Sequence, residues 1–495
     1  MICISIAQES RRLALADMLN ASRQCDLLEI RLDRFEKAPD VAELLAHKSK
    51  PIIFSCRREQ DGGAWGGSEE ERLALLRQCI VDKADYVEIE LDVADQIRPF
   101  PPTKRVISYS NWRETPTNIA EIYAEAQTKK PDVVKLMTLA RSPEEAWPLL
   151  QILAKPALPT VVVGLGKPGV MLSVFGKKIG APWTYAALEK GMEAYPGQPT
   201  VNDLRQIYHY DDIGRSTRLV AVTGFTLRDQ VTAAALNAGL AHLGRGTRCL
   251  PVGVGSIGLF RKVMDAVKMA GVVVGEEHRE VMTGIATELE PEAREAHATD
   301  LLVPKDKSWQ GYNTLAQAAL AALEGTLSRG TGAGEMLVGR MVMIVGVNAT
   351  ARALASSVKN RQGIVIIASH QREKALNLAQ AIQSRHVQFE ALYTTMHEIL
   401  IVCDEEKEHS RSKSPGGETG IHAGYLRAGM TVMDLTAATH RSALLREAEL
   451  RGCQIVSPRA ILRAQLAAQL HLLTGKEAPA EVLEQPLLDM LEEEA

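Results

Sequence analysis

The chain has 495 residues, of which 46% are hydrophobic and 24% are charged, and its formal net charge is −4. This length is too great for one hydrophobic core, so we expect two or three globular domains, and the weakly acidic balance excludes a protein drawn to nucleic acid or acidic lipid by a basic field. The absence of a long apolar run excludes a membrane span, and seven scattered cysteines with no C-x-x-C pair and no signal peptide are typical of a reduced, cytoplasmic protein.

Strand-like and helix-like segments alternate through residues 1–215. Helical patterns, such as those over 69–81 and 118–129, separate most of the strand candidates. Eight such units predict a (β/α)₈ barrel, which places its chemistry at the C-terminal ends of the strands. The eight strand candidates are ICISIA, LLEIRLD, PIIFSCR, YVEIELD, KRVISYS, VVKLMT, TVVVGLG and WTYAAL.

Charged side chains occur near the ends of several predicted barrel strands. Lys135 lies near the end of the apolar run PDVVKLMTL, Glu29 and Arg31 end an earlier strand, and Arg57 ends another. Side chains alternate along a strand, so Glu29, Arg31 and Asp33 share one face, which predicts a wet, functional barrel interior. An amine, a carboxylate and two guanidinium groups at strand ends favour a lysine that forms an imine with a ketone, in a site that also grips an anionic substrate.

Structural roles are the alternatives for each of these residues. Lys135 taken alone is a candidate for a strand-end lysine that extends its amine to solvent. Glu29 and Arg31 are candidates for a buried ion pair, and Arg57 for a salt-bridge partner at the barrel rim.

A second alternation of strands and helices follows the barrel. Residues 216–310 mix short strands (RLVAVTG, TRCLPVGV, AGVVVG) with helices, the longest over 258–269, before an alanine-rich helix over 314–323. Beyond a glycine-rich linker at 330–334, six strands predict an open, doubly wound sheet, interrupted by a polar surface loop over 404–420. We therefore predict domains at 1–215, 216–312 and 313–455, with C-terminal helices over 456–495 packing back on the middle domain.

The motifs of the N-terminal half are similar, in order and spacing, to those of type I 3-dehydroquinate dehydratases. They are EIR at 29–31, S-C-R with D-G-G at 55–63, V-V-K ending at Lys135, G-K-P-G at 166–169, F-G at 175–176 and P-G-Q at 196–198. The resemblance implies that Lys135 attacks the ring ketone of 3-dehydroquinate and forms an imine, which acts as an electron sink while water is eliminated. It implies that Glu29, Arg31, Arg57 and Gln198 hold the polyol and organise the pocket. The loop over 61–68, with four glycines, is either a lid over the ligand or a plain surface turn.

Several residues depart from the pattern of this family. Ser110 occupies the position of the histidine that acts as general acid and base, and a serine hydroxyl cannot take a proton near neutral pH without a neighbouring base. Ser173 replaces the arginine that grips the substrate carboxylate, Ala194 replaces a pocket serine, and Asp61 replaces a glutamate. The substitutions predict a slow or altered reaction, with Glu29, Asp61 or Tyr109 as the proton carrier.

Residues 218–475 resemble shikimate dehydrogenase. The segment over 345–354 follows a strand and opens a helix, as a dinucleotide fingerprint does. The resemblance implies NADP as the expected cofactor, with NAD left open, and Arg372 as a substitute in the clamp for the 2′-phosphate. It also implies that Asn237, Asn313 and Gln465 bind substrate. The residues expected at the cofactor are Gly346, Asn348, Ala349, Ala351, Arg352 and Arg372, where Asn348 and Ala349 replace glycines.

The catalytic pair of that second family is missing. Arg279 occupies the position of the catalytic lysine and stays protonated, and Leu315 replaces the catalytic aspartate. We therefore expect the C-terminal half to keep its fold without this reaction. The whole sequence predicts a shikimate-pathway protein whose barrel dehydrates a small cyclic keto acid and needs no cofactor. No metal site is expected, and an oligomer is possible. The alternative is a catalytically degenerate binding or scaffold protein that retains both folds.

Overall fold

The computed structural model of the protein describes residues 1–166, 168–306, 308–328, 336–403, 420–436 and 441–492. The chain forms two compact units, Met1–Leu219 with Gly246–Val267, and Val220–Arg245 with Lys268–Ala495. The four domain ranges predicted from the sequence stay predictions. The predicted linker at 330–334 and the polar loop over 404–420, except its last residue, lie outside the described residues.

Eight parallel strands form a near-closed barrel in unit 1, in the order β7-β6-β5-β4-β3-β2-β1-β8. Each strand coincides with one of the eight sequence candidates, which confirms the predicted fold class. The strands are β1 (Ile2–Ile6), β2 (Leu27–Arg31), β3 (Ile52–Ser55), β4 (Tyr86–Glu90), β5 (Lys104–Asn111), β6 (Val133–Leu139), β7 (Thr160–Leu165) and β8 (Thr184–Ala186).

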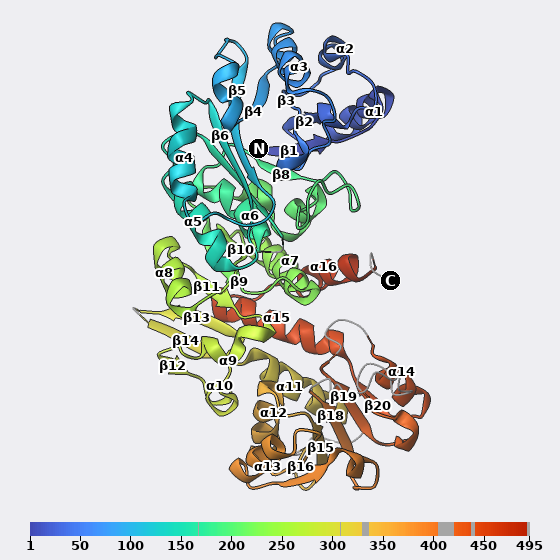
Figure 1. Cartoon of the computed structure of the whole chain (residues 1–495). Coiled ribbons are helices and arrows are strands. Elements are labelled where there is room, and N and C mark those ends of the chain that lie inside the picture. Colours follow the sequence, from blue (N-terminus) through green and yellow to red (C-terminus); the bar gives the residue numbers. More distant parts are fainter. Residues whose placement is uncertain (167, 307, 329–335, 404–419, 437–440, 493–495) are drawn as a thin grey trace. The chain divides into compact units, whose positions relative to one another are not determined.

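Helices lie outside these strands and cover the barrel (Figure 1). They are α1 (Arg11–Ala21), α2 (Val41–Ala46), α3 (Glu69–Val81), α4 (Ile119–Thr128), α5 (Pro143–Ala154) and α6 (Gly169–Ile179). Helix α3 shows why the sequence folds in this way. Ser68 and Glu71 form a capping box at its start, and Leu73, Leu76 and Ile80 follow at helical spacing and are buried.

The interior of the barrel changes from apolar to polar along the strands. Its apolar part includes Cys3, Leu27, Ile53, Val106 and Val133, which belong to one buried cluster. Further along the same strands, the register pairs Ser5 with Glu29, Arg31 with Ser55, and Ser108 with Lys135. Because paired residues on parallel strands point to the same side of the sheet, the polar residues gather toward the C-terminal end of the barrel.

The first sheet of unit 2 contains the strands β9, β11, β13, β14 and β12, in that spatial order. Their bounds are β9 (Arg218–Val222), β11 (Gly271–Val273), β12 (Glu288–Leu289), β13 (Leu301–Lys305) and β14 (Ser308–Tyr312). The antiparallel pair β13–β14 was not among the predicted strands, because SWQGY lacks a run of β-branched residues. The helices are α7 (Leu227–His242), α9 (Arg279–Met282) and α10 (Pro291–Ala296), while β10 (Thr247–Pro251) and α8 (Ile257–Val267) belong to unit 1.

The second sheet of unit 2 is parallel, with the strand order β17-β16-β15-β18-β19-β20. This is the order of a doubly wound dinucleotide-binding sheet, in which ligands bind where the order reverses, here between β15 and β18. The strands are β15 (Met341–Val345), β16 (Ile364–Ser369), β17 (Arg385–Gln388), β18 (Ile399–Val402), β19 (Thr431–Asp434) and β20 (Gln454–Val456).

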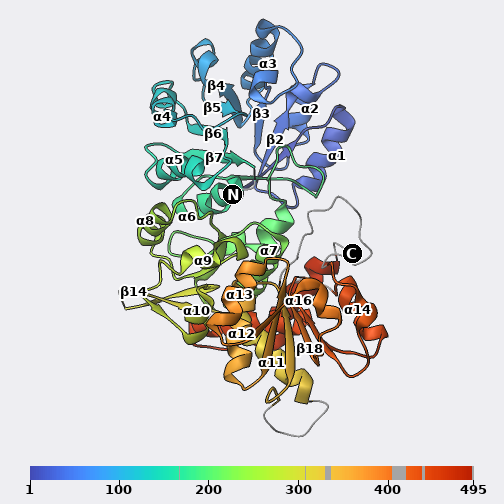
Figure 2. The ribbon, with the colours of Figure 1, turned by 60° about the horizontal axis from the view of Figure 1, so that its bottom comes forward.

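Helices cover both faces of this sheet (Figure 2). On one face lie α11 (Thr314–Ser328), α12 (Ala349–Asn360) and α13 (Arg372–Ala381), and α14 (Ala443–Leu450) covers the other. The closing helices are α15 (Pro458–Thr474), which packs against both α11 and α7, and α16 (Ala480–Glu492), which packs against α7.

Candidate active site

Lys135 lies inside the barrel and not at its rim. Its side chain is 1% exposed, and its Nζ donates to Glu88 Oε2 at 2.8 Å. The same nitrogen lies 3.5 Å from Glu29 Oε1 and 4.3 Å from the centre of the Tyr185 ring. The alternative of a lysine that extends its amine into solvent is therefore wrong.

Glu29 and Arg57 form the second ion pair of the site. Arg57 Nη2 donates to Glu29 Oε1 at 2.5 Å, and the hydroxyls of Ser5 and Ser55 also donate to this carboxylate. Burial acts to raise the pKa of Glu29, but the charges of Arg57 and Lys135 outweigh it and hold that pKa well below its ordinary value. Glu29 is therefore an anion in the folded protein.

Glu88 connects the two pairs into one cluster. Its Oε1 lies 3.4 Å from Arg57 Nε, while its Oε2 accepts from Lys135. The cluster contains two carboxylates and two cations, and none of the four side chains is more than 6% exposed. A buried ion cluster of this kind adds little net stability over an apolar core, whereas removal of one partner costs about 3–5 kcal/mol. Such a cluster in an enzyme-like barrel is therefore a functional candidate.

Arg31 has a different partner from the one that the sequence suggested. Its Nε and Nη2 donate to Asp33 at 2.9 and 2.7 Å, so the alternative of a direct Glu29–Arg31 ion pair is wrong. Arg31 also donates to the carbonyl of Gly62 at 3.3 Å, and Asp33 accepts from the backbone N–H of Ala64. Arg31 and Asp33 thus fasten the glycine-rich loop to the barrel.

Gly62 of the loop over 61–68 packs against Trp112, the first residue after β5. Gly62 has φ +77°, and a Cβ at this position would lie 2.0 Å from the Trp112 ring. Only glycine meets both conditions, so this close packing is encoded in the sequence. Asp61 in the same loop pairs with Arg58 at 2.6 Å.

Three buried donors of the barrel have no acceptor among the described residues, and the ring of one of them, Tyr185, lies against Lys135. Tyr185 Oη, Trp112 Nε1 and Gln198 Nε2 have no hydrogen-bond partner within the described part of the chain. The amide of Gln198 is fixed by its oxygen, which accepts from the N–H of Ala194 at 2.7 Å. An unmet buried donor costs free energy, and a polyol with a carboxylate supplies the missing acceptors.

No described histidine of the barrel takes the place of the one absent at Ser110. Ser110 is half-buried and pairs in register with Met137, two residues beyond the level of Lys135. His47 hydrogen-bonds its own helix, and His209 lies 3.7 Å from Asp212. Ser173 is buried in α6, at the position where the sequence pattern expects an arginine.

The predicted proton carriers occupy unequal positions. Glu29 is the nearest to Lys135, but its carboxylate is already committed to Arg57. Alternation along β5 places Tyr109 on the face opposite Ser108 and Ser110, and Asp61 is held by Arg58. These three remain predictions, and none is as close to Lys135 Nζ as Glu88.

Sequence reasoning did not select Glu88 as a site residue. Alternation along the strand YVEIELD puts Glu88, Glu90 and Asp92 on one face, but this pattern does not show which of the three faces the lysine. Glu90 pairs instead with Arg72 of α3 at 2.7 Å, and burial raises its pKa to about 7 despite that arginine. Asp92 pairs with Arg58.

The dinucleotide fingerprint of unit 2 lies between β15 and α12. Gly346 has φ +106°, a conformation that favours glycine. Asn348 caps α12: its Oδ1 accepts from the N–H of Ala351 at 2.9 Å, and its Nδ2 donates to the carbonyl of Cys403. Arg352 is held by Glu280 at 2.6 Å and by the carbonyl of Ala296.

These residues fit a bound dinucleotide, with one reservation for the pyrophosphate. The helix N-terminus and the turn at Gly346 form the backbone cradle, but the Asn348 side chain already occupies one of the N–H groups that a phosphate uses. Ser369 ends β16 and His370 follows it, at the place where an NAD site carries an acidic residue, and Arg372 is exposed just beyond. NADP as the cofactor, and a weakened contact to its pyrophosphate, stay predictions.

The predicted substrate residues of unit 2 are buried polar side chains. Asn237 is fully buried in α7, and Asn313 caps α11 through the N–H of Ala316. Gln465 donates to Asp300 Oδ2 at 3.1 Å. Leu315 is buried, and its N–H also donates to Asp300, so a carboxylate lies beside this position without being part of residue 315.

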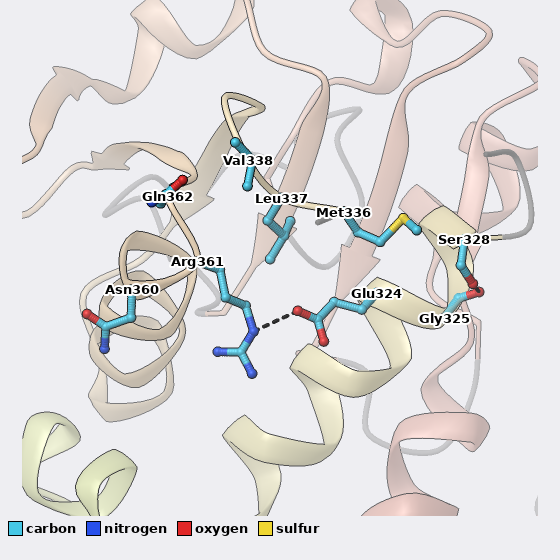
Figure 3. Close-up of a pocket in the computed structure, with 9 residues that line it drawn as sticks. All are labelled: Glu324, Gly325, Ser328, Met336, Leu337, Val338, Asn360, Arg361 and Gln362. Atoms are coloured by element: carbon cyan, nitrogen blue, oxygen red, sulfur yellow. Dashed lines mark hydrogen bonds and ion pairs between the residues drawn. The ribbon is translucent and has the colours of Figure 1, made fainter. Parts of the chain in front are cut away.

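A cavity of about 620 Å³ lies elsewhere in unit 2 (Figure 3). Glu324 and Arg361 form a 2.6 Å ion pair in its wall, and residues 336–338 and 360–362 also line it. These segments precede β15 and β16, at the sheet edge opposite the fingerprint, so the cavity is separate from the cofactor cradle.

Three further features bound the chemistry. No set of three His, Cys, Asp or Glu residues within the described ranges could hold a metal ion. In the same ranges, no helix has both the length and the apolar character to cross a membrane. All seven cysteines are buried thiols.

The chain is similar to one family model over its barrel, and to known proteins over part or most of its length. Residues 2–215 match the family described as Type I 3-dehydroquinase. The chloroplastic bifunctional 3-dehydroquinate dehydratase/shikimate dehydrogenase of Arabidopsis thaliana is 26% identical over 477 residues, which cover 92% of this chain and 79% of that protein. The 3-dehydroquinate dehydratase of Methanopyrus kandleri is 33% identical over 187 residues, or 37% of this chain and 86% of that protein. A solved structure of the dehydroquinate dehydratase and shikimate dehydrogenase from S. pombe has 17% identity and a TM-score of 0.44, over 98% of each chain.

Proposed function

The chain belongs to the type I 3-dehydroquinate dehydratase family, fused to a shikimate dehydrogenase-like half, and we propose that its barrel dehydrates 3-dehydroquinate through an imine on Lys135. The observation that carries this proposal is the position of Lys135 Nζ, buried and 2.8 Å from a carboxylate. The amine has a base within hydrogen-bond reach, and in this proposal Arg57 and Gln198 bind the substrate. This is the arrangement that an amine nucleophile needs.

Glu88 prepares Lys135 for attack in this proposal. The Glu88 carboxylate accepts a proton from the lysine ammonium, and the neutral amine adds to the ring ketone carbon. Protonated Glu88 returns this proton to the hydroxyl of the carbinolamine, the hydroxyl leaves as water, and a protonated imine remains. No other described carboxylate lies as close to this nitrogen.

Elimination follows from the electron demand of the imine. The carbon beside the iminium carbon loses a proton, and the hydroxyl on the next carbon leaves as water, which creates the ring double bond. Hydrolysis of the imine releases 3-dehydroshikimate and restores the amine, so the net change is the loss of one water. We assign this proton to Glu88, because its carboxylate is the one nearest to the lysine nitrogen and Ser110 supplies no base.

The remaining polar groups orient the substrate. Gln198 Nε2, Tyr185 Oη and Trp112 Nε1 are donors that await acceptors, and Arg57 supplies a fixed cation for the acidic group. Arg31 acts indirectly in this proposal, since it donates to the carbonyl of Gly62 and so holds the glycine-rich loop.

Lys135→Arg is the variant that tests the proposal. Arginine keeps the positive charge beside Glu88 and Glu29 but cannot form an imine. We expect a folded protein with no measurable dehydration of 3-dehydroquinate, against clear turnover by the unchanged chain. Activity retained in Lys135→Arg would contradict the imine, and an inactive but ligand-binding unchanged chain would favour the scaffold alternative.

For the C-terminal half, we infer NADP binding without efficient shikimate oxidation. When bound, NADP supplies or accepts hydride, but a ketone or alcohol partner also needs a proton relay. Arg279 and Leu315 occupy the two relay positions, and neither side chain exchanges a proton near neutral pH. NADPH fluorescence titration that saturates, together with no shikimate-dependent NADPH formation, is the expected result; robust oxidation contradicts it. A cytoplasmic location and the oligomeric state remain predictions.

A further inference from the structure

The ring of Tyr185 lies against the nitrogen of Lys135 inside the barrel. Tyr185 is the middle residue of β8, where it pairs in register with Cys3 of β1. Lys135 Nζ lies 4.3 Å from the centre of the ring, within the range in which an aromatic face attracts a cation. The nitrogen thus lies beside an aromatic face as well as beside the carboxylates of Glu88, at 2.8 Å, and Glu29, at 3.5 Å.

This contact between cation and ring is shielded from water. Neither Tyr185 nor Lys135 is more than 2% exposed, and Tyr185 belongs to the same buried apolar cluster as Met137, Trp183 and Tyr195. The attraction of a ring for a cation is strongest where water is excluded, and there it shifts an equilibrium by about thirtyfold. The ring is therefore close enough and dry enough to affect the charge of the lysine nitrogen.

Imine formation changes which contacts the nitrogen keeps. A lysine ammonium has three N–H groups and can donate to both carboxylates, whereas a protonated imine has a single N–H group to donate. The attraction of a ring face acts on the charge itself and needs no N–H group. The contact with Tyr185 thus does not depend on the hydrogens that the nitrogen loses.

Tyr185 also differs from the carboxylates in that it takes no proton. Glu88 is a carboxylate again once water has left the carbinolamine, and it then competes for the proton of the imine itself. A neutral imine is a poor electron sink, so loss of this proton stops the elimination. Burial raises the pKa of the Tyr185 hydroxyl well above its ordinary value, and the charge of Glu29 acts in the same direction, so Tyr185 stays neutral.

We propose that the aromatic face of Tyr185 keeps the imine on Lys135 protonated during dehydration, which makes Tyr185 a catalytic residue. This inference rests on the imine of the proposed function and deepens it, because it names the group that preserves the positive charge. Glu88 moves protons in this scheme, while the ring stabilises the cation without competing for its proton.

Fluorinated phenylalanines at position 185 test the face without removing the ring. Tyr185→Phe is the reference: it keeps the face but lacks the hydroxyl that orients the substrate, so its KM should be about fivefold above that of the unchanged chain. In 4-fluoro-, 3,5-difluoro- and 3,4,5-trifluorophenylalanine, each fluorine draws electron density from the face. We expect the basic limb of the pH profile of kcat to move progressively downward from the reference, by about one pH unit over the series. KM should stay within about threefold of the reference, because the ring itself remains.

Tyr185→Leu removes the face altogether, and Trp183→Leu is its matched control. At a pH on the basic limb, kcat of Tyr185→Leu should be lower than that of Tyr185→Phe by about tenfold or more. Trp183 is 1% exposed and belongs to the same cluster, but its ring packs edge-on against Tyr86 at 5.6 Å. Trp183→Leu should lower the melting temperature and leave the basic limb in place. The fluorinated series decides the question if Tyr185→Leu does not fold.

Borohydride trapping with 3-dehydroquinate distinguishes failure of this inference from failure of the imine. An adduct on Lys135 throughout the fluorinated series, together with a basic limb that does not move, overturns the role of Tyr185 and leaves the imine in place. An equal movement of the basic limb in Trp183→Leu also overturns it, because the effect would then come from packing. No adduct in the unchanged chain overturns the imine and this inference together.

Discussion

Glu88→Gln separates the role of Glu88 as a base from its role as a neighbour. The wild-type cluster balances Lys135 and Arg57 against Glu29 and Glu88, and glutamine leaves it with a net charge of +1. The amide oxygen of glutamine still accepts a hydrogen bond at the place of Oε2. We therefore expect a stability cost of about 2–3 kcal/mol, less than the roughly 3–5 kcal/mol of a buried charge left fully unpaired.

The kinetic effect should be larger than the effect on stability. Without a carboxylate 2.8 Å away, the lysine proton must pass to solvent, and loss of a positioned base costs about 10²–10⁴-fold in kcat. KM should change much less, because Arg57 and Gln198 remain. The kcat of Glu88→Gln should also rise by about tenfold per pH unit above neutrality, as hydroxide takes over the role of the base.

Two variants serve as controls for steady-state dehydration of 3-dehydroquinate. Glu88→Asp keeps the charge but draws it back by one methylene, so an intermediate loss of about tenfold is expected. Glu90→Gln removes a carboxylate two residues along the same strand, where it pairs with Arg72, and should keep kcat within about threefold. A kcat of Glu88→Gln within threefold of the unchanged chain refutes the role of Glu88.

Three further predictions concern the two halves separately. Ser110→His should raise dehydratase kcat by roughly tenfold or more, because it restores an acid–base group on the face of Lys135; an unchanged kcat at constant fold counts against this. Asn348→Gly should tighten NADPH binding by about three- to tenfold, because it releases the N–H of Ala351. Ser457→Ala, which removes the corresponding cap from α15, should leave NADPH affinity unchanged, and fluorescence titration measures both variants. Burial raises the pKa of Glu90 from its ordinary 4.5 to about 7, so between these pH values the folded chain keeps a proton that the unfolded chain has lost. The contribution of Glu90 to stability therefore falls by up to about 3 kcal/mol as pH rises through that window. Glu90→Gln should flatten this part of the curve of denaturation midpoint against pH, and an unaltered slope contradicts the raised pKa.

The barrel was predictable from the sequence because each strand is a short apolar run. Runs such as IIFS and VVKLMTL indicate buried parallel strands, and the helical patterns between them predict that strands and helices alternate. The pair β13–β14 was not predictable in this way, since its second strand, SWQGY, owes its pairing to a neighbouring strand and not to its own propensity.

The site was predictable in its residue types but not in its pairings. Alternation placed Glu29, Arg57 and Lys135 in the barrel interior, yet partners depend on the register between strands. Glu88 and Glu90 lie two positions apart on β4, so alternation gives both the same side of the strand. Glu90 nevertheless pairs with Arg72 of α3 and not with Lys135. In unit 2, the hydrogen bond from Arg228 to Gln465 joins residues 237 positions apart, which no local pattern signals.

Borohydride trapping with 3-dehydroquinate tests the central claim most directly. The reaction reduces an imine to a stable amine, and peptide mass spectrometry locates the bond. We predict one adduct, on Lys135, formed by the unchanged chain and absent from Lys135→Arg. Turnover of 3-dehydroquinate with no adduct, or an adduct on another lysine, contradicts the account.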